Sequence, residues 1–489
     1  MEKIDIQGRD AAWREDMRKA MTAKQRADIP RVVMPMLDGS FRVTCNNEVN
    51  EGLSLEQAQL EATRCLDCPN PSCVEGCPVG IHIPDFIKNI QRGDLPMAAA
   101  ILKSTSALPA VCGRVCPQEK QCESRCIYNK MKKEPVAIGY LERFAADAEI
   151  ARGEANDTQA VECNGIRVAV AGSGPAGLSF AGEMARRGFE VDVFEALHEI
   201  GGVLKYGIPE FRLPNRIVDA ELANLARAGV RFHTDTVIGK TLSYDDLLNQ
   251  GFKGIFVASG AGLPRFMGIP GENYCGVLSS NEYLTRINLM GAGRPGSDTP
   301  APLGKRVAVI GGGNTAMDSV RTARRMGAER AMIIYRRSEA EMPARREEIE
   351  HAKQEGVEFM TLANPVEYLA DERGRVRAVR VQRMELGEPD ASGRRKPVPV
   401  PGAIDEIEID LAIVSVGVSP NPLIPNNIDG LNVTDRGTIA VDANHQSSLP
   451  TIYAGGDIVR GGATVILAMG DGRQAAASMA EKLLADVNS

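Results

Sequence analysis

The spacing of apolar residues divides the chain into two parts that meet near residue 160. Residues 1 to about 150 are polar and carry apolar positions at helical spacing, in segments such as LSLEQAQLEATR (53–64) and EPVAIGYLERFAADAEIAR (134–152). No strand pattern is evident in this part. The pattern therefore predicts a helical N-terminal region.

The remainder alternates between short apolar strands and helices. IRVAVAGSGPAGLSFAGEMARRGFEVDVFEA (166–196) predicts a strand, a glycine turn, a helix and a second strand, and KRVAVIGGGNTAMDSVRTARRMGAERAMIIYRR (305–337) repeats the unit. Further strands are predicted at VRAVRVQRMEL and EIDLAIVSVG, and the segment from TIYAGGD onward again predicts strand, turn and helix. Two such units indicate an α/β fold with two Rossmann-like domains. The run RREEIEHAKQEGVEF (345–359) predicts an exposed helix face with ion pairs four residues apart.

Length and composition bound the class of protein. A chain of 489 residues is too long for one ordinary core, and 43% hydrophobic with 25% charged residues is typical of a globular enzyme. The net charge of -7, with no basic stripe interleaved with aromatics, argues against nucleic acid as a partner. No signal-like N-terminus and no stretch of about 18 apolar residues occurs, so we expect a cytoplasmic protein with no membrane partner.

Eight of the eleven cysteines fall into two short runs. In a reducing cytosol such runs are more often metal ligands or redox groups than disulfides. Uneven spacing and Cys-Pro pairs favour two 4Fe-4S clusters over the alternative of two structural zinc sites. One cysteine of such a run often ligates the other cluster, so sequence order does not assign the ligands. The members are Cys65, Cys68, Cys73 and Cys77 in the first run, and Cys112, Cys116, Cys122 and Cys126 in the second.

The remaining cysteines and the histidines carry no assignment. Cys45, Cys163 and Cys275 are single and predict bystander thiols. The five histidines are scattered, without a pair four residues apart as in a helical metal site.

The first glycine turn predicts a dinucleotide site. Gly172, Gly174 and Gly177 follow an apolar strand, with Pro175 and Ala176 opening the helix. Glu195 closes the second strand, where a carboxylate can accept hydrogen bonds from a ribose 2′-OH. The alternative is a tight strand-to-helix turn without a ligand.

The second glycine turn predicts a site for NADPH. Gly311, Gly313 and Ala316 form the G-x-G-x-x-A version, with Asn314 and Thr315 inside the turn. Its second strand ends in Arg336 and Arg337 instead of an acid, and guanidinium groups pair with a 2′-phosphate that a carboxylate would repel. The alternative is that these arginines only solvate a strand end.

FAD is then the natural ligand of the first unit. Gly456 and Asp457, at a later strand end, fit the ribityl or phosphate portion of a flavin, the alternative being a plain helix N-cap.

Together these residues resemble the glutamate synthase small-subunit family. That family includes the large subunit of the NADH-dependent ferredoxin:NADP oxidoreductase and the N-terminal portion of dihydropyrimidine dehydrogenase. The resemblance runs from about Cys65 to the C-terminus, whereas the residues before about 50 carry no motif we can assign. It rests on both cysteine runs and on AGSGPAG, GGVLKYGIPEFRLP, SGAGLPR, IGGGNTAMD, YRR and AGGDIVRGGATVILAMGDGR.

The resemblance implies a helical iron–sulfur domain, residues 1–160, and an FAD domain interrupted by an NADPH domain. The FAD domain is expected at 161–298 and 440–489, and the NADPH domain at 299–439. One cluster would be held by Cys65, Cys68, Cys73 and Cys126. The other would be held by Cys77, Cys116 and Cys122. Its fourth ligand would be Cys112, which the softness of a thiolate favours, or Glu142. The positions that would line the flavin are Gly201, Gly202, Arg212, Ser259, Gly260, Asp457, Thr464 and Val465.

The implied function is electron transfer among NADPH, FAD and the clusters on behalf of a partner protein. No acid–base group is needed for hydride transfer, so we assign no catalytic side chain. The partner would be the glutamate synthase large subunit or, alternatively, a small flavin and 2Fe-2S subunit working with ferredoxin. EALHEIGGVLKYGIPEFRLP (195–214) and MELGEPDASGRRKPVP (384–399) look closer to this alternative. A disulfide reductase, which needs a C-x-x-C beside the flavin, and a zinc-stapled scaffold are further alternatives.

Overall fold

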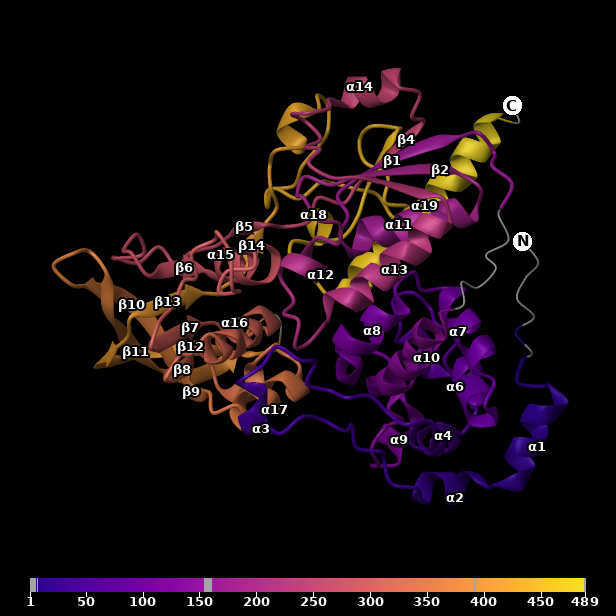
Figure 1. Ribbon diagram of the computed structural model, residues 1–489, viewed down its shortest axis with the longest axis horizontal. Helices are drawn as coiled ribbons and strands as arrows, with labels where there is room; N and C mark the ends of the chain where they lie inside the picture. Colours follow the sequence, from indigo (N-terminus) through magenta and orange to yellow (C-terminus); the bar gives the residue numbers. More distant parts are fainter. Residues whose placement is uncertain (1–5, 7, 154–160, 391–392, 488–489) are drawn as a thin grey trace.

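The computed structural model describes residues 6, 8–153, 161–390 and 393–487. A helical N-terminal region lies beside two α/β units (Figure 1). In that view the helical region is at the lower right, the first unit above it and the second unit to the left. None of the helices in these ranges combines the length and apolar character needed to cross a lipid bilayer.

The N-terminal region is helical, as the sequence predicts. Helix α4 begins after Ser54, whose hydroxyl accepts the amide of Gln57 while the Gln57 side chain returns to the Ser54 amide. Helix α10 begins at Ile138, four residues later than predicted. The helices are α1 (Ala12–Ala20), α2 (Ala23–Asp28), α3 (Gly39–Arg42), α4 (Leu55–Arg64), α5 (Ser72–Glu75), α6 (Ile83–Arg92), α7 (Leu95–Lys103), α8 (Pro109–Val115), α9 (Ile127–Lys130) and α10 (Ile138–Arg152), with 3-10 turns η1 (Gln118–Lys120) and η2 (Glu123–Arg125).

The first α/β unit holds a parallel five-stranded sheet in the order β15-β4-β1-β2-β3. Helices α11 and α19 cross closely, since a Cβ at Gly472 would lie 2.2 Å from the Ala176 carbonyl oxygen. The strands are β1 (Arg167–Ala171), β2 (Glu190–Phe194), β3 (Val230–His233), β4 (Gly254–Val257) and β15 (Ile452–Ala454). The helices are α11 (Pro175–Arg186), α12 (Val203–Tyr206), α13 (Asn215–Arg227), α14 (Tyr244–Asn249), α18 (Asp457–Arg460) and α19 (Val465–Val487).

The second unit holds a parallel sheet in the order β6-β13-β7-β8-β9 and an antiparallel sheet β10-β11-β12. Alternate residues of β7 face opposite sides: Val307 and Val309 pack among helices, whereas Ala308 and Ile310 pack with the antiparallel sheet. The strands are β6 (Val277–Ser279), β7 (Arg306–Ile310), β8 (Arg330–Tyr335), β9 (Glu358–Thr361), β10 (Ala363–Ala370), β11 (Val376–Pro389), β12 (Arg395–Glu408) and β13 (Leu411–Val414). The helices are α15 (Ser280–Leu284), η3 (Thr285–Leu289), α16 (Asn314–Arg325), η4 (Glu339–Glu341) and α17 (Arg346–Gln354), and η5 (Pro425–Asn427) follows the unit.

The second unit is inserted in the first, and the chain crosses between them at the antiparallel pair β5 (Leu263–Pro264) and β14 (Val418–Ser419). The predicted boundary at 298/299 falls inside the inserted unit, because β6 pairs with β13. The predicted return at 440 falls late, because Ile424 and Ile428 already pack with the first sheet. Three-residue β6 is too short to give a periodic signal in the sequence.

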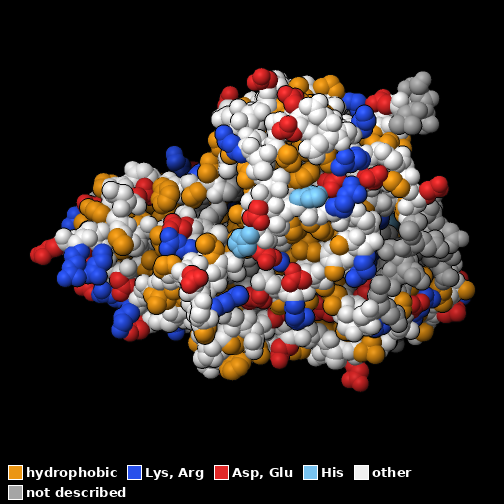
Figure 2. All heavy atoms as spheres, turned by 45° about the horizontal axis from the view of Figure 1, so that its top comes forward, with side chains coloured by type: hydrophobic (Ala, Val, Ile, Leu, Met, Phe, Trp, Pro, Cys, Tyr) orange, Lys and Arg blue, Asp and Glu red, His pale blue; other side chains and the backbone are white. Residues whose placement is uncertain are grey.

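Charged side chains of both signs are visible on one face of the protein (Figure 2). On the face shown in Figure 2, acidic and basic groups are interspersed over both α/β units. The net charge of -7 therefore does not gather into one acidic field on that face.

Candidate functional site

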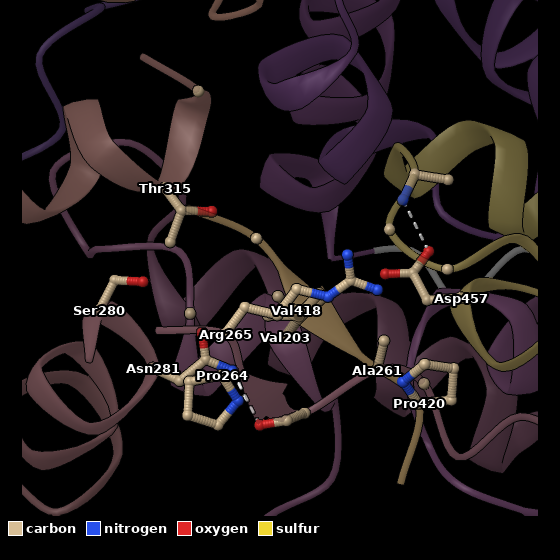
Figure 3. A pocket seen from close by; sticks show the side chains of 18 of the residues that line it. Val203, Ala261, Pro264, Arg265, Ser280, Asn281, Thr315, Val418, Pro420 and Asp457 are labelled. Atoms are coloured by element: carbon tan, nitrogen blue, oxygen red, sulfur yellow. Dashed lines mark hydrogen bonds between the residues drawn. The ribbon is translucent and has the colours of Figure 1, made fainter. Parts of the chain in front are cut away.

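A cavity of about 2290 Å³ lies between the two α/β units and is lined by both glycine turns. Pockets for one small molecule usually measure 300–1,000 Å³, so this cavity has room for two nucleotides. In Figure 3, Thr315 of the second unit and Asp457 of the first lie on opposite sides of the cavity. The crossover residues Pro264 and Val418 lie between them.

The first glycine turn has the geometry that a bound pyrophosphate requires. Gly172 has φ +109°, and a Cβ there would lie 2.5 Å from the Ala258 carbonyl oxygen. A Cβ at Gly177 would lie 2.1 Å from the Gly172 carbonyl oxygen, so this glycine serves close packing of helix on strand. Gly174 faces open space, with nothing within 4 Å of its added Cβ, and leaves room for a ligand at the start of α11.

Glu195 lies at the end of β2 and lines the cavity beside this turn. One carboxylate oxygen accepts the Ser173 amide at 2.9 Å and hydroxyl at 2.5 Å, and the other accepts the Leu197 amide at 3.0 Å. Glu195 therefore shapes the turn as well as facing the cavity. Across the sheet, the buried hydroxyl of Ser259 lines the cavity and has no hydrogen-bond partner among the described residues, which suits a polar group of a ligand.

Asp457 forms the opposite wall with the residues that follow β15. Its carboxylate accepts the Ala463 amide at 3.0 Å, and burial raises its pKa. A capping carboxylate would instead accept amides of the first turn of its own helix, and Gly456 holds the N-cap position of α18. The plain N-cap alternative therefore does not describe Asp457, whose carboxylate shapes the glycine turn beside the cavity.

Most positions predicted to bind nucleotides line this cavity, and three lie behind its wall. Gly177 and Ala316 pack their helices onto the strands, and the amide of Gly201 donates to the Ser173 hydroxyl at 2.9 Å. The predicted positions that line the cavity are Gly172, Gly174, Pro175, Ala176, Glu195, Gly202, Arg212, Ser259, Gly260, Gly311, Gly313, Asn314, Thr315, Arg336, Arg337, Gly456, Asp457, Thr464 and Val465.

The two arginines after β8 have different surroundings. Arg336 is exposed and lines the cavity. Arg337 is buried, and its guanidinium donates to the Arg395 carbonyl oxygen and pairs with Asp390, at 2.8 Å and 2.7 Å. Sequence reasoning missed Arg394, which lines the cavity from the β11–β12 hairpin, because the tip of a hairpin has no fixed spacing from the glycine turn.

The eight clustered cysteines separate into two groups in the structure. In the first group, the thiols of Cys68, Cys73 and Cys126 each have Cys65 among the neighbouring charges that influence their pKa, and in the second group the thiols influence one another together with Glu142. Burial raises the pKa of these seven thiols, to about 11 for Cys77. The first group is Cys65, Cys68, Cys73 and Cys126, and the second is Cys77, Cys112, Cys116 and Cys122. In the part of the chain that the structure describes, no three His, Cys, Asp or Glu side chains converge on a single ion position.

Within the second group, Cys112 and Glu142 differ in what they contact. The Cys112 sulfur lies 3.4 Å from the Met469 sulfur, in a fully buried position. Burial raises the pKa of Glu142 to about 8, and its buried Oε1 has no hydrogen-bond partner among the residues that the structure describes. A buried carboxylate oxygen without a partner, beside the four thiols of this group, suits a ligand of a metal cluster.

The second group lies next to the cavity and the first group lies nearer to the surface. Val115, which precedes Cys116, lines the cavity, and Met469 follows the lining residue Ala468. In the second group Cys112, Cys116 and Cys122 are buried and Cys77 is partly exposed, whereas all four members of the first group are partly exposed. None of the described cysteines lines the cavity itself, as a disulfide reductase would require.

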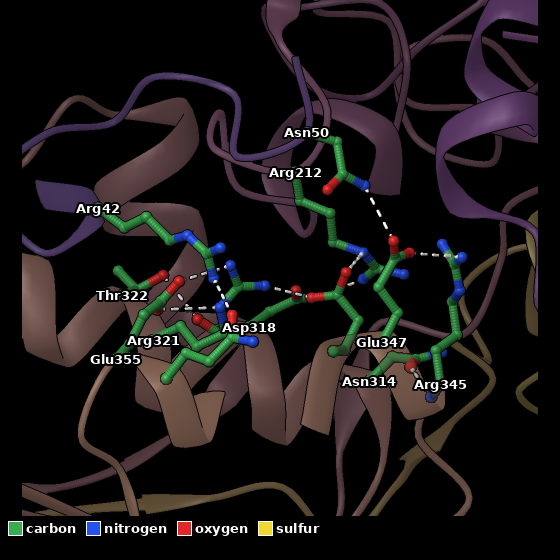
Figure 4. Close-up of polar contacts among 12 residues, drawn as sticks. Arg42, Asn50, Arg212, Asn314, Asp318, Arg321, Thr322, Arg345, Glu347 and Glu355 are labelled. Carbon is green, nitrogen blue, oxygen red and sulfur yellow. Dashed lines mark hydrogen bonds and ion pairs between the residues drawn. The ribbon is translucent and has the colours of Figure 1, made fainter. Parts of the chain in front are cut away.

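A buried ionic network joins the two α/β units beside the cavity (Figure 4). Arg212, from the loop before α13, pairs with Asp318 of α16 at 2.8 Å. Arg321 of α16 pairs with Glu348 and, at 2.8 Å, with Glu355. The prediction of an exposed helix face at 345–359 is wrong, because Glu348, His351 and Glu355 are buried. Glu348 and Glu355 pair with Arg321 and Arg325 of α16. Because these partners lie outside residues 345–359, the sequence of that segment alone did not indicate that it is buried.

The helical region contributes to the same junction. Arg42 donates to the Gln354 side chain at 2.7 Å, and Asn50 donates to Glu347 at 3.1 Å. Arg345 donates to the Arg114 carbonyl oxygen at 2.6 Å. The three parts of the chain are thus held together at one place.

Two family models match the chain, "dihydropyrimidine dehydrogenase domain II, 4Fe-4S cluster" at residues 42–154 and "pyridine nucleotide-disulphide oxidoreductase" at residues 166–472. The glutamate synthase [NADPH] small chain of Escherichia coli K12 is 37% identical over 92% of this chain and 97% of that protein. The NADPH-Fe(3+) oxidoreductase subunit beta of Geobacter sulfurreducens is 36% identical over 84% of this chain and 64% of that protein. The structure of Mycobacterium tuberculosis FprA in complex with NADPH has a TM-score of 0.56 at 20% identity, covering 66% of this chain and 86% of that chain, which indicates a shared fold.

Proposed function

Because the chain belongs to the glutamate synthase small-subunit family, we propose that it takes electrons from NADPH through FAD to two 4Fe-4S clusters and delivers them to a separate protein subunit. The family makes it an NADP-dependent flavin and iron–sulfur oxidoreductase. The observation that carries the finer proposal is the continuous cavity that joins both glycine turns and has the second cysteine group behind the wall residues Val115 and Ala468.

The residues around the cavity fit the two nucleotides. The first turn, with Glu195, Ser259 and Asp457, fits FAD, which supplies the conversion of a hydride into single electrons when bound. The second turn, with Arg336, fits NADPH. The crossover residues Pro264 and Val418 lie where the two nucleotides would meet. The protein would there hold the nicotinamide and flavin rings in the orientation that hydride transfer needs.

We assign one cluster to each cysteine group. The second group, three of whose four members are buried, would hold the cluster nearest the flavin, and the partly exposed first group would hold the cluster from which electrons leave. For the fourth ligand of the second cluster we favour Glu142 over Cys112, in contrast to the preference from sequence. Glu142 Oε1 has no hydrogen-bond partner within the described parts of the chain, whereas the Cys112 sulfur contacts Met469.

Replacing each of these two candidate ligands by alanine, in separate variants, tests the assignment of the fourth ligand. We expect Cys112→Ala to keep the iron content of the protein, and Glu142→Ala to lose about half of it, since one of two four-iron clusters would lose a ligand. Iron and acid-labile sulfide analysis of anaerobically purified protein measures both. Iron loss in Cys112→Ala with retention in Glu142→Ala would assign the ligand to Cys112.

The partner is proposed to be the large subunit of a glutamate synthase. A second candidate is a small flavin and 2Fe-2S subunit with ferredoxin, favoured by the stretches 195–214 and 384–399. The described residues of the second stretch include the end of β11, the start of β12 and Arg394, which lines the cavity. The cytoplasmic location expected from the sequence stays a prediction.

Anaerobic purification of the tagged full chain from its host, with mass spectrometry of stoichiometric partners, separates the two candidates. An amidotransferase subunit with an FMN barrel supports glutamate synthase, and a small flavin and 2Fe-2S subunit supports the second. Titration with NADPH and NADH tests the electron source, and we expect bleaching of the flavin absorbance by NADPH in preference to NADH. Bleaching by NADH alone would contradict the proposal.

A further inference from the structure

Two buried cations lie beside Cys65, and one of them comes from the N-terminal segment to which the sequence assigns no motif. Arg26 of α2 is 3% exposed and Lys88 of α6 is 1% exposed. Arg26 donates from Nη1 to the Thr63 carbonyl oxygen at 2.7 Å, and Lys88 donates from Nζ to the Cys65 carbonyl oxygen at 2.5 Å. Gln91 Oε1 accepts from both, at 3.5 Å from Arg26 Nη1 and 2.8 Å from Lys88 Nζ. The two charges therefore lie together at the end of α4, where the first cysteine run begins.

Neither cation is balanced by a carboxylate. In the parts of the chain that the structure describes, no acidic side chain forms an ion pair with Arg26 or Lys88, and their acceptors are carbonyl and amide oxygens. Asp67, within the first cysteine run, pairs with Arg14 and, at 2.5 Å, with Arg18. Burying a guanidinium or ammonium group is costly without a counter-charge, so this pair of cations favours a negative group nearby.

The Cys65 thiol is the neighbouring group that acts most strongly on both cations. Burial lowers the pKa of Arg26 and of Lys88, and the largest opposing charge effect comes from Cys65 in each case, ahead of Asp67. Cys65 belongs to the cysteine group that we assign to the first cluster. An iron–sulfur cluster held by four thiolates carries a net negative charge, which grows by one when the cluster is reduced. Cations buried beside such a cluster stabilise its reduced form more than its oxidised form.

We propose that Arg26 and Lys88 are the counter-charges of the cluster in the first cysteine group, and that they raise its reduction potential. A higher potential makes this cluster a better acceptor for electrons on their way to the partner subunit. The inference rests on the proposed function, in which this group holds a 4Fe-4S cluster. It gives the segment before residue 50 a task in setting the potential of that cluster.

Both cations also contact the end of α4, which is a structural role. A cation beside the last carbonyl oxygens of a helix is favourable in itself. Loss of that role would lower the stability of the helical region but would not shift the potential of one cluster. The reduction potential therefore separates the two roles.

The test is a redox titration of the anaerobically purified holoprotein, followed by EPR spectroscopy. The signal of the first cluster is the one that Cys68→Ser changes. Arg26→Gln is expected to shift the equilibrium of this cluster about 10-fold toward the oxidised form, which is about 59 mV to lower potential for one electron. Lys88→Gln is expected to act in the same direction. Arg26→Lys, which keeps the charge, is expected to stay within about 2-fold of the wild-type equilibrium.

The matched control is Lys24→Gln, which removes the same charge two residues earlier on α2, at an exposed position. Water and salt screen an exposed charge, so the control should leave the equilibrium within about 2-fold of wild type. A neutral variant, Arg26→Gln or Lys88→Gln, whose potential equals that of the control would overturn the inference for that residue. An equal shift of both clusters would overturn it as well, because the proposal places both cations beside the first group.

Iron analysis covers a variant that does not keep its cluster. If Arg26→Gln loses the first cluster and Arg26→Lys keeps it, the charge at this position is required and the inference is supported. If Arg26→Lys loses the cluster as well, the shape of the arginine side chain is what matters, and the counter-charge role of Arg26 is overturned.

The wild-type protein separates this inference from the proposed function. If excess dithionite reduces no cluster whose signal Cys68→Ser changes, the first group does not carry electrons, and the proposed function fails together with the inference. If that cluster is reduced and both neutral variants leave its potential unchanged, only the counter-charge role is overturned.

Discussion

Replacing Cys122 by serine is expected to stop electron delivery to the partner subunit while leaving reduction of the flavin by NADPH unchanged. Cys122 belongs to the buried second cysteine group, next to the cavity, but does not line the cavity itself. Partner-dependent turnover should fall by more than about 100-fold, since changes beside metal ligands already cost 10- to 100-fold. Flavin bleaching is followed by stopped-flow absorbance, and turnover is measured with the co-purified partner.

The same substitution in the first group tests where electrons leave. Cys68→Ser should also lower partner-dependent turnover, with about half of the iron lost in each variant. Cys275→Ser, at an exposed single cysteine, is the control and should change neither quantity. Normal turnover in Cys68→Ser would show that electrons leave from the second group, and full iron content in either variant would refute the grouping.

The second large effect is a loss of stability, which is expected when the buried ionic network between the two α/β units is broken. Arg321 pairs with Glu348 and Glu355, and its guanidinium carbon lies 4.7 Å from the centre of the Phe211 ring. Arg321→Met keeps much of the volume but leaves buried carboxylates short of a partner. We expect the free energy of unfolding of the holoprotein to fall by about 3–5 kcal/mol, the usual cost of breaking a buried pair. Denaturant unfolding followed by circular dichroism and flavin release measures the change.

Arg330→Met is the matched control for this variant. Arg330 pairs with Glu358 at 2.7 Å, but both side chains are about half exposed. Water already screens this pair, so its loss should cost less than about 1 kcal/mol. Equal losses of unfolding free energy in the two variants would show that burial does not determine how much the Arg321 ion pairs stabilise the fold.

The junction also bears on how the two nucleotide sites are coupled. Phe211 and Arg212 belong to the first unit, whereas Asp318, Arg321 and Arg325 lie on α16 of the second. Burial raises the pKa of Asp318 to about 6, against the opposing effect of the Arg212 guanidinium. A rotation of one unit against the other would have to separate these buried charges. The network thus holds the cavity in the arrangement in which both turns face it.

The sequence by itself determined the parts that follow from local periodicity and spacing. An apolar strand, a glycine turn, a helix and a second apolar strand are specified by residues that lie close together in the sequence. The units β1-α11-β2 and β7-α16-β8 were therefore predictable to within a few residues. The cysteine runs and the glycine turns predicted the classes of cofactor for the same reason, because the spacing of their residues is short-range.

Only the tertiary structure decided what depends on residues far apart in the chain. The three-residue strand β6 joins the second sheet through a partner more than 100 residues later, which moved the domain boundary. Cys126 lies with Cys65, Cys68 and Cys73, a grouping that the family resemblance implies but that the order of the cysteines in the chain does not give. Glu348 is buried because Arg321 meets it from another helix, and Arg337 turns to Asp390 because the hairpin returns to β8. Such pairings depend on charge and packing between residues far apart in the chain. They leave no periodic pattern in the local sequence from which they could be predicted.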